Sequence, residues 1–361
     1  MRVMHVITGL ATGGAERMLE RLVTAKRDQP VDLVVVSLTP GGAVADRLRR
    51  AGIPVFDLGM RRGFPDIRAV FRLARLIRKT KPDAVQSWLY HADAAATLAL
   101  MLSGRRKQTR LFWNLRCSSM EGAARSLSQK MALGMGVLFS RLPDAVIANS
   151  EAGREFHYRL GYRPKRFLVI PNGIDTGLFR PDPVARAELR GELGIAAAAP
   201  VIAMIARLDP VKDHATFLAA LERLPRITAL AAGEGTEKLP GLPNLRRLGE
   251  RADVPRILAA SDLLVSTSTS EGFPNAVLEG LAAGLPAVAT DAGDTKRIVG
   301  DCGSIVPAGD ARALAAAIEG FFDRPPAQRQ ALQDAARRRA VERFGIGRMV
   351  AAFDALYRGT S

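Results

Sequence analysis

The amino-acid sequence predicts an α/β protein of two doubly wound units, each a parallel sheet covered by helices. Short apolar runs rich in β-branched residues alternate with amphipathic helical segments. This order of elements starts over midway along the chain. The length of 361 residues also exceeds what one hydrophobic core supports, which favours two domains of about 150 to 200 residues.

The expected strands are short and are each followed by a turn and a helical pattern. In the first half they are 3–8, 33–38, 84–88, 111–115, 145–149 and 167–170. In the second half they are 201–205, 228–232, 263–267 and 287–290. Two prolines at 181 and 183 and an alanine run at 196–199 place the junction near residue 180. The predicted domains are therefore 1–180 and 181–340, followed by a helical segment 341–361 whose apolar patch at 351–357 must pack against another surface.

Composition excludes several classes of protein. With 48% hydrophobic and 24% charged residues, the chain has the means to form a compact soluble core, unlike a disordered protein. The two cysteines, Cys117 and Cys302, are far apart and offer neither a disulfide scaffold nor a thiolate metal cluster. No acidic pair with metal-ligand spacing is evident, so no metal and no cofactor are expected. The longest apolar stretch, 131–148, is interrupted by charges and a proline, so no membrane span is expected.

A phosphate site is predicted after the first strand. Gly13 and Gly14 follow that strand and precede a helix, so backbone N–H groups at the helix N-terminus can approach a phosphate. The alternative is that both glycines only allow a tight turn. A nicotinamide dinucleotide is excluded, because the second strand ends in Ser37 rather than an acidic residue.

The segment SEGFPNAVLE carries two carboxylates after the strand 263–267. Pro274 suits a first helical turn, which places Glu271 in the preceding loop and Glu279 inside a nearly apolar helix. A carboxylate on such a helix needs partners, and polyol hydroxyls would supply them. The alternative is a Glu279 bonded within the core and a Glu271 in solvent.

Four segments together resemble the retaining glycosyltransferases of CAZy family 4, which include sucrose synthase and bacterial mannosyl and N-acetylhexosaminyl transferases. The segments are ARLDPVK at 206–212, PNGID at 171–175, the stretch 270–286 and the glycines of 233–235. The most specific feature is Glu271 and Glu279 with seven residues between them. The resemblance implies the GT-B fold, with two Rossmann-like domains, a cleft between them, and a C-terminal helix that crosses back to the first domain.

The resemblance also implies roles for particular residues. Glu279 would bind ribose hydroxyls, Glu271 the hydroxyls of the transferred sugar, and Arg207 with Lys212 the diphosphate. His91 would lie near the reactive carbon of the sugar, unless it is only a satisfied helix cap. His5, His157 and His214 are assigned to structural roles. Further donor contacts are expected from Gly13, Gly14, Gly249, Phe273, Pro274 and Asn275.

The implied activity is retaining, metal-independent transfer of a hexose or N-acetylhexosamine from a nucleotide-sugar to a saccharide acceptor. A UDP-sugar is favoured and GDP-mannose remains open. Segments 88–96 and 113–119 are closer to members that build bacterial surface polysaccharides, which favours a lipid-linked acceptor. Many members carry an acidic residue near Gly293 where this chain has Arg297, which weakens any assignment of the donor.

The charge is concentrated in one half of the chain. Residues 1–180 hold 30 basic against 14 acidic side chains, whereas residues 181–361 hold 22 of each. The expected helix 66–80 carries an apolar stripe and, on an adjacent face, a row of basic residues. The apolar residues are Ile67, Val70, Phe71, Ala74 and Ile77, and the basic ones are Arg68, Arg72, Arg75 and Lys79. We therefore expect a cytoplasmic protein docked on the anionic inner face of the membrane. The alternatives are a solvated arginine face, and a basic nucleic-acid-binding protein without transferase activity. The basic clusters lack interleaved aromatic residues, so no nucleic acid is expected.

Overall fold

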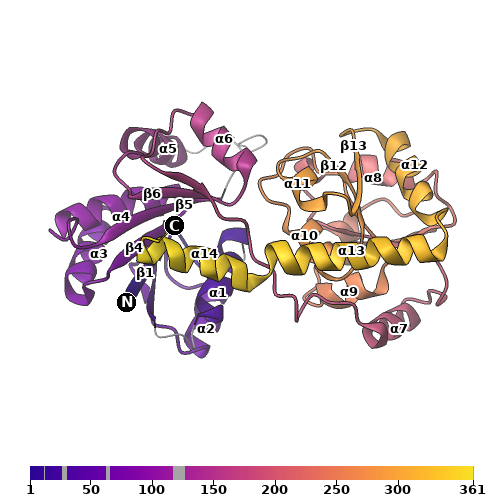
Figure 1. The fold of residues 1–361 in the computed structure, drawn as a ribbon, viewed down its shortest axis with the longest axis horizontal. Coiled ribbons are helices and arrows are strands. Elements are labelled where there is room, and N and C mark those ends of the chain that lie inside the picture. Colours follow the sequence, from indigo (N-terminus) through magenta and orange to yellow (C-terminus); the bar gives the residue numbers. More distant parts are fainter. Residues whose placement is uncertain (12, 27–30, 62–65, 117–126, 361) are drawn as a thin grey trace. The chain divides into compact units, whose positions relative to one another are not determined.

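A computed structural model describes residues 1–11, 13–26, 31–61, 66–116 and 127–360. The chain forms two compact units, residues 1–173 with 346–361, and residues 174–345 (Figure 1). The junctions therefore lie at 173/174 and 345/346, and the predicted boundaries at 180 and 340 are wrong by several residues. The reason is local pairing: Ile174 forms a parallel bridge with Gly345 and donates its N–H to the carbonyl of Phe344 at 2.8 Å.

The first unit is a parallel sheet of seven strands in the order β3-β2-β1-β4-β5-β6-β7. Its strands are β1 (Arg2–Ile7), β2 (Asp32–Ser37), β3 (Val55–Asp57), β4 (Ala84–Trp88), β5 (Arg110–Leu115), β6 (Ala145–Ala148) and β7 (Phe167–Val169). Its helices are α1 (Gly14–Ala25), α2 (Ala43–Arg50), α3 (Ile67–Thr80), α4 (Tyr90–Leu102), α5 (Leu127–Phe139), α6 (Glu151–Arg159) and α14 (Ile346–Arg358). The six expected strands are confirmed. The edge strand β3 is additional, and its three residues include two exposed ones.

The second unit is a parallel sheet of six strands in the order β10-β9-β8-β11-β12-β13. Its strands are β8 (Val201–Ile205), β9 (Thr228–Ala232), β10 (Leu245–Gly249), β11 (Leu263–Ser266), β12 (Ala287–Thr290) and β13 (Gly303–Val306). Its helices are α7 (Pro183–Glu192), α8 (His214–Leu221), α9 (Val254–Ala260), α10 (Asn275–Ala282), α11 (Thr295–Val299), α12 (Ala311–Phe322) and α13 (Pro326–Phe344). The four expected strands are confirmed, and both outermost strands, β10 and β13, are additional.

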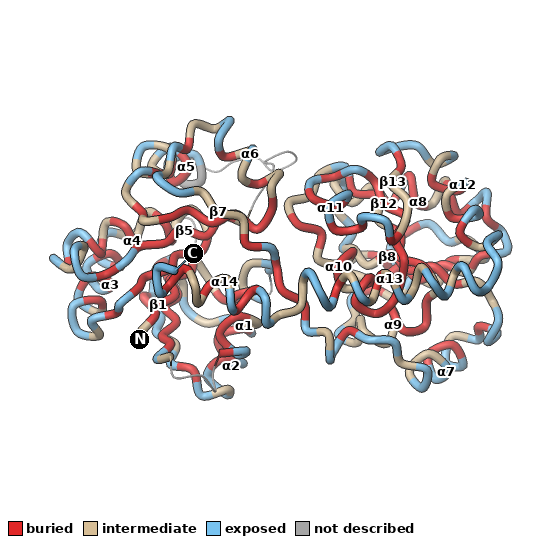
Figure 2. Tube along the Cα trace, in the orientation of Figure 1, coloured by how far each residue is buried: buried red, intermediate tan, exposed pale blue. Residues whose placement is uncertain are grey.

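Each sheet is buried on both faces, so its strands are the most deeply buried stretches of the chain (Figure 2). In the first unit, α1, α2 and α14 cover one face and α3, α4 and α5 the other. The predicted return of the C-terminal helix is confirmed, because Met349, Phe353 and Tyr357 of α14 pack in the core of the first unit. The buried ammonium of Lys26, next to the end of α1, pairs with Asp354 of α14.

Helix α3 departs from the expected apolar stripe. Asp66 caps it by accepting a hydrogen bond from the backbone N–H of Arg68 at 2.9 Å. Its buried residues are Ala69, Val70, Leu73, Ala74 and Ile77. Ile67 and Phe71 are instead 59% and 56% exposed, because they lie to one side of the face that these buried residues form. Among the described residues, no helix is long and apolar enough to cross a membrane.

Candidate functional site

Both sheets have a topological switch point, where the connections that leave two neighbouring central strands run to opposite sides of the sheet. In the second unit it lies between β8 and β11, and in the first unit between β1 and β4. Loops at the carboxyl ends of such strands diverge and leave room for a ligand. The predicted site residues Arg207 and Lys212 follow β8, and Glu271 follows β11. Gly13 and Gly14 follow β1, and His91 follows β4.

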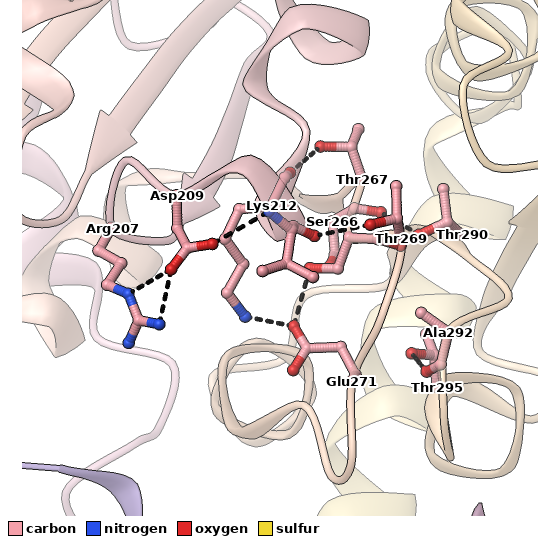
Figure 3. Close-up of polar contacts among 12 residues, drawn as sticks. Arg207, Asp209, Lys212, Ser266, Thr267, Thr269, Glu271, Thr290, Ala292 and Thr295 are labelled. Atoms are coloured by element: carbon pink, nitrogen blue, oxygen red, sulfur yellow. Dashed lines mark hydrogen bonds and ion pairs between the residues drawn. The ribbon is translucent and has the colours of Figure 1, made fainter. Parts of the chain in front are cut away.

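The loop after β8 is held by Asp209. Its Oδ1 accepts the backbone N–H of Val211 at 3.0 Å and so caps the short 3-10 helix Pro210–Lys212. Its Oδ2 accepts from Nε and Nη2 of Arg207 at 3.0 and 2.7 Å (Figure 3). Partial burial opposes the charged form, but the bonds from Arg207 and Val211 prevail and lower the pKa of Asp209. The Arg207 side chain is 63% exposed, so its guanidinium faces solvent while two of its N–H groups bond to one oxygen of Asp209.

The loops after β8 and β11 are joined by a charged contact. The ammonium of Lys212 donates to Oε1 of Glu271, and the hydroxyl of Ser268 donates to the same oxygen at 2.8 Å (Figure 3). The hydroxyl of Thr267 donates to the carbonyl of Lys212 at 2.8 Å, which fixes the backbone that carries the lysine. The structure thus brings Lys212 and Glu271 together, in a pair whose side chains are only 23% and 14% exposed.

Two glycines allow these loops to approach their neighbours. Gly233, after β9, has φ +146°, and a Cβ there would collide with the carbonyl of Ala206. Gly293, after β12, has φ +58°, and a Cβ there would collide with the carbonyl of Glu271. Glycine is favoured at such values of φ, and any larger residue would displace the two loops that carry the charged side chains.

The helix α10 carries the second glutamate. It begins at Asn275, so Pro274 is the N-cap residue rather than part of the first turn as predicted. Val277 and Leu278 face the core, whereas Glu279 is half-buried. Phe273 is buried against Phe344, with ring centroids 6.0 Å apart. Its role in the structure is therefore to anchor the loop before α10.

Gly249 ends the strand β10 at the same edge of the sheet as Gly233. It has φ +66°, and its carbonyl accepts the backbone N–H of Gly233 at 2.8 Å. The structure therefore joins Gly249 to the loop after β9 through the backbone.

The helix α1 begins at Gly14, with Gly13 as its N-cap residue. Gly13 has φ −72°, so its backbone does not require glycine. A Cβ at this position would instead collide with the carboxylate of Glu16, which lies against the helix N-terminus. Negative charge at a helix N-terminus is favourable, so an incoming anion would compete with Glu16 for this place.

Helix α4, which carries His91, is fixed at its first turn. It starts directly after β4 through Leu89, whose φ of +73° is strained for a non-glycine residue. Nε2 of His157 accepts the hydroxyl of Tyr90 at 2.8 Å, because Nδ1 of His157 donates to the carbonyl of Gly153 at 2.6 Å. Burial lowers the pKa of His157 to about 4, so the imidazole is neutral. His157 therefore positions the turn that holds His91.

Comparison with known proteins decides the family. The sequence model described as Glycosyltransferase Family 4 matches residues 12–178, and the model described as Glycosyl transferases group 1 matches residues 199–324. The chain belongs to glycosyltransferase family 4. Its fold is GT-B, as the resemblance implied.

Individual proteins are similar to long stretches of this chain. A D-inositol 3-phosphate glycosyltransferase of Kineococcus radiotolerans is 30% identical over 250 residues, which span 60% of this chain but only 57% of that relative. The lipopolysaccharide core biosynthesis glycosyltransferase LpsE of Rhizobium meliloti is 27% identical over 88% of both chains. The crystal structure of Anabaena HepE in complex with UDP and glucose superposes with a TM-score of 0.84 at 24% identity, over 99% of this chain and 100% of that one.

In this family 4 glycosyltransferase the sequence missed several residues that shape the site. Asp209, Ser268 and Thr267 hold the charged side chains but carry no motif of their own. His157 was assigned a structural role, and the structure adds that it bonds to Tyr90, next to His91. A capping pattern, Asp209 before Pro210, was the one available signal.

Among the described residues, no three His, Cys, Asp or Glu side chains are grouped so that they could hold a metal ion.

Proposed function

We propose that the protein transfers a hexose or N-acetylhexosamine from a nucleotide-sugar to a saccharide acceptor, with a UDP-sugar as the favoured donor. The observation that carries this proposal is the Lys212–Glu271 pair with Arg207 beside it at the switch point of the second unit. A related fold is described in complex with UDP and glucose, which supports a uridine nucleotide over GDP-mannose.

The chemistry of the site suits departure of a diphosphate. Negative charge builds on the leaving group as the glycosidic bond breaks, and preorganised cations stabilise it. Arg207 and Lys212 supply two cations at one edge of the sheet. Because Lys212 already neutralises Glu271, binding of the diphosphate would draw the ammonium toward phosphate and turn Glu271 toward sugar hydroxyls. Glu279 on α10 would bind the ribose.

We propose that transfer retains the anomeric configuration and needs no divalent metal. The first test is a screen of nucleotide-sugars for thermal stabilisation, followed by turnover of the best donor. The product anomer is then determined by proton NMR, with and without EDTA. An inverted product would refute retention. Activity that EDTA abolishes and magnesium restores would refute metal independence.

We further propose that the first unit docks on an anionic membrane and receives a lipid-linked acceptor. Large apolar side chains are exposed on three successive helices, α3, α4 and α5, of which α3 contacts α4 and α4 contacts α5. They are Ile67, Phe71, Met101, Leu102, Met131 and Leu138. Exposed basic side chains lie among them: Arg68, Arg72, Arg75, Lys79 and Lys130. Such a mixture is typical of a surface that inserts into the interface of anionic lipid.

Sedimentation with liposomes tests the docking surface. We expect binding to phosphatidylglycerol vesicles that weakens with salt, and weakens further when Arg68, Arg72 and Arg75 are replaced by glutamine. The control replaces three arginines of α2, Arg47, Arg49 and Arg50, by glutamine. It removes the same charge from the same unit. Binding that is equal for neutral and anionic vesicles, or equally reduced by both triple replacements, would refute this surface.

A further inference from the structure

An arginine with a largely buried guanidinium lies in the first unit, where β5 ends. Arg116 directly follows β5, and its guanidinium carbon lies 4.6 Å from the centroid of the Trp88 ring. One Nη atom donates to Oδ1 of Asn172. Because β5 pairs with β4, these contacts place Arg116 at the carboxyl edge of the sheet, beside the switch point between β1 and β4.

The charge of Arg116 is not matched by the described residues around it. Its Nε and its other Nη are buried and have no hydrogen-bond partner, and no carboxylate in the described part of the chain pairs with it. Burial lowers the pKa of Arg116 to about 9, and the nearby Tyr357 offsets only part of that effect. Arg190 in the second unit is the contrast: it is also buried, but its Nη2 pairs with Asp262 at 3.0 Å.

A second polar side chain near Arg116 also lacks a partner. Asn114 lies two residues earlier on β5 and is completely buried, yet neither atom of its amide is bonded within the described chain. The register of β4 and β5 pairs Asn114 with Trp88, the residue whose ring Arg116 covers. Buried polar atoms in native proteins are almost always satisfied by protein, water or ligand. Two such groups on one face of the sheet therefore indicate a partner that the described part of the chain does not provide.

We propose that Arg116 and Asn114 bind a phosphate ester carried by the acceptor. The adjacent Nε and Nη of a guanidinium match two oxygens of one phosphate, and this bidentate pairing is the contact for which arginine is best suited. The inference rests on the proposed function, because it names the chemistry of the acceptor for that transfer. A lipid-linked phosphate and a soluble sugar phosphate share this chemistry.

Calorimetric titration of the full chain with inorganic phosphate tests the site. Saturating UDP is present throughout, so that Arg207 and Lys212 are already occupied, and ionic strength is fixed. We expect wild type to bind phosphate and Arg116→Gln to bind it about tenfold to a hundredfold more weakly. Arg47→Gln is the matched control, because Arg47 lies in the same unit and already pairs with Glu20 at 2.6 Å. It should bind phosphate as wild type does.

Two outcomes overturn the site: no phosphate binding by wild type, or equal binding by wild type and Arg116→Gln. If Arg116→Gln does not fold, Arg116→Lys replaces it, and we expect weaker binding because lysine lacks the forked donors. Failure of UDP to bind in the first step would instead refute the proposed donor site, so the two failures are distinguishable. Titration with glucose 6-phosphate and with dioctanoyl phosphatidic acid then separates the sources. Tighter binding of either one than of inorganic phosphate supports the site.

Discussion

Replacing Lys212 with glutamine separates the electrostatic role of this residue from its role in folding. The ammonium is part of a mostly buried pair with Glu271, and in the proposed reaction it moves to the diphosphate. A hydrogen bond to a charged group contributes about 1.5 to 3 kcal/mol. Its loss in the transition state should lower kcat/KM for the donor by roughly one to two decades. The affinity for UDP should fall in parallel, because UDP carries the same diphosphate.

The fold should tolerate this change. Glu271 keeps the hydrogen bond from Ser268 at 2.8 Å, and the backbone of the loop is still held by Thr267. Loss of this mostly buried contact costs about 1 to 3 kcal/mol, which lowers the melting temperature of a domain of this size by about 2 to 12 °C. Donor kinetics, calorimetric binding of UDP and thermal melting measure the three effects.

Lys238→Gln is the matched control for this experiment. Lys238 is exposed and belongs to the same unit, in the short 3-10 helix Thr236–Lys238. Its kinetics and UDP affinity should equal those of wild type. A Lys212→Gln variant within twofold of wild type in both kcat/KM and UDP affinity would refute the assignment. An equal loss in Lys238→Gln would show that the effect is only one of net charge.

Three further changes test other parts of the structure. His91→Ala should lower turnover far more than it weakens UDP binding, because His91 is expected at the reacting end of the sugar; steady-state kinetics beside calorimetry decide, and equal losses would reduce His91 to a helix cap. Glu279→Ala should mainly weaken binding of UDP and leave binding of inorganic pyrophosphate unchanged, since only UDP has a ribose; a similar loss for both ligands contradicts this role. Asp354→Ala should destabilise the first unit by about 3 to 5 kcal/mol in denaturant unfolding, because it leaves the buried Lys26 uncompensated. The change Lys26→Met in the same background should restore most of that stability, and a lack of rescue would show that the pair is not what holds α14.

The charged residues of the candidate site could be found in the sequence because they lie in short contiguous segments. Arg207 and Lys212 are five positions apart with the capping residue Asp209 between them, and Glu271 precedes α10 within one loop. Residues that only support these groups could not be found this way. His157 bonds to Tyr90 across a separation of 67 residues. That two nitrogens of Arg116 lack hydrogen-bond partners depends on the packing around it, which the sequence does not show.

By itself the sequence determined the two parallel sheets and ten of their strands, because a strand buried on both faces must be an apolar run whatever surrounds it. It did not predict three of the four edge strands, β3, β10 and β13, since an edge strand is only partly buried and tolerates residues such as Arg246 and Arg247. The fourth edge strand, β7, was predicted because its three residues are all apolar. Nor could it place the domain boundaries or predict that Ile67 and Phe71 are exposed. Those features depend on contacts between distant segments: Ile174 pairs with Gly345, and α14 returns to the first sheet. Periodicity records the burial of each segment, but only the tertiary structure decides which distant segment covers it.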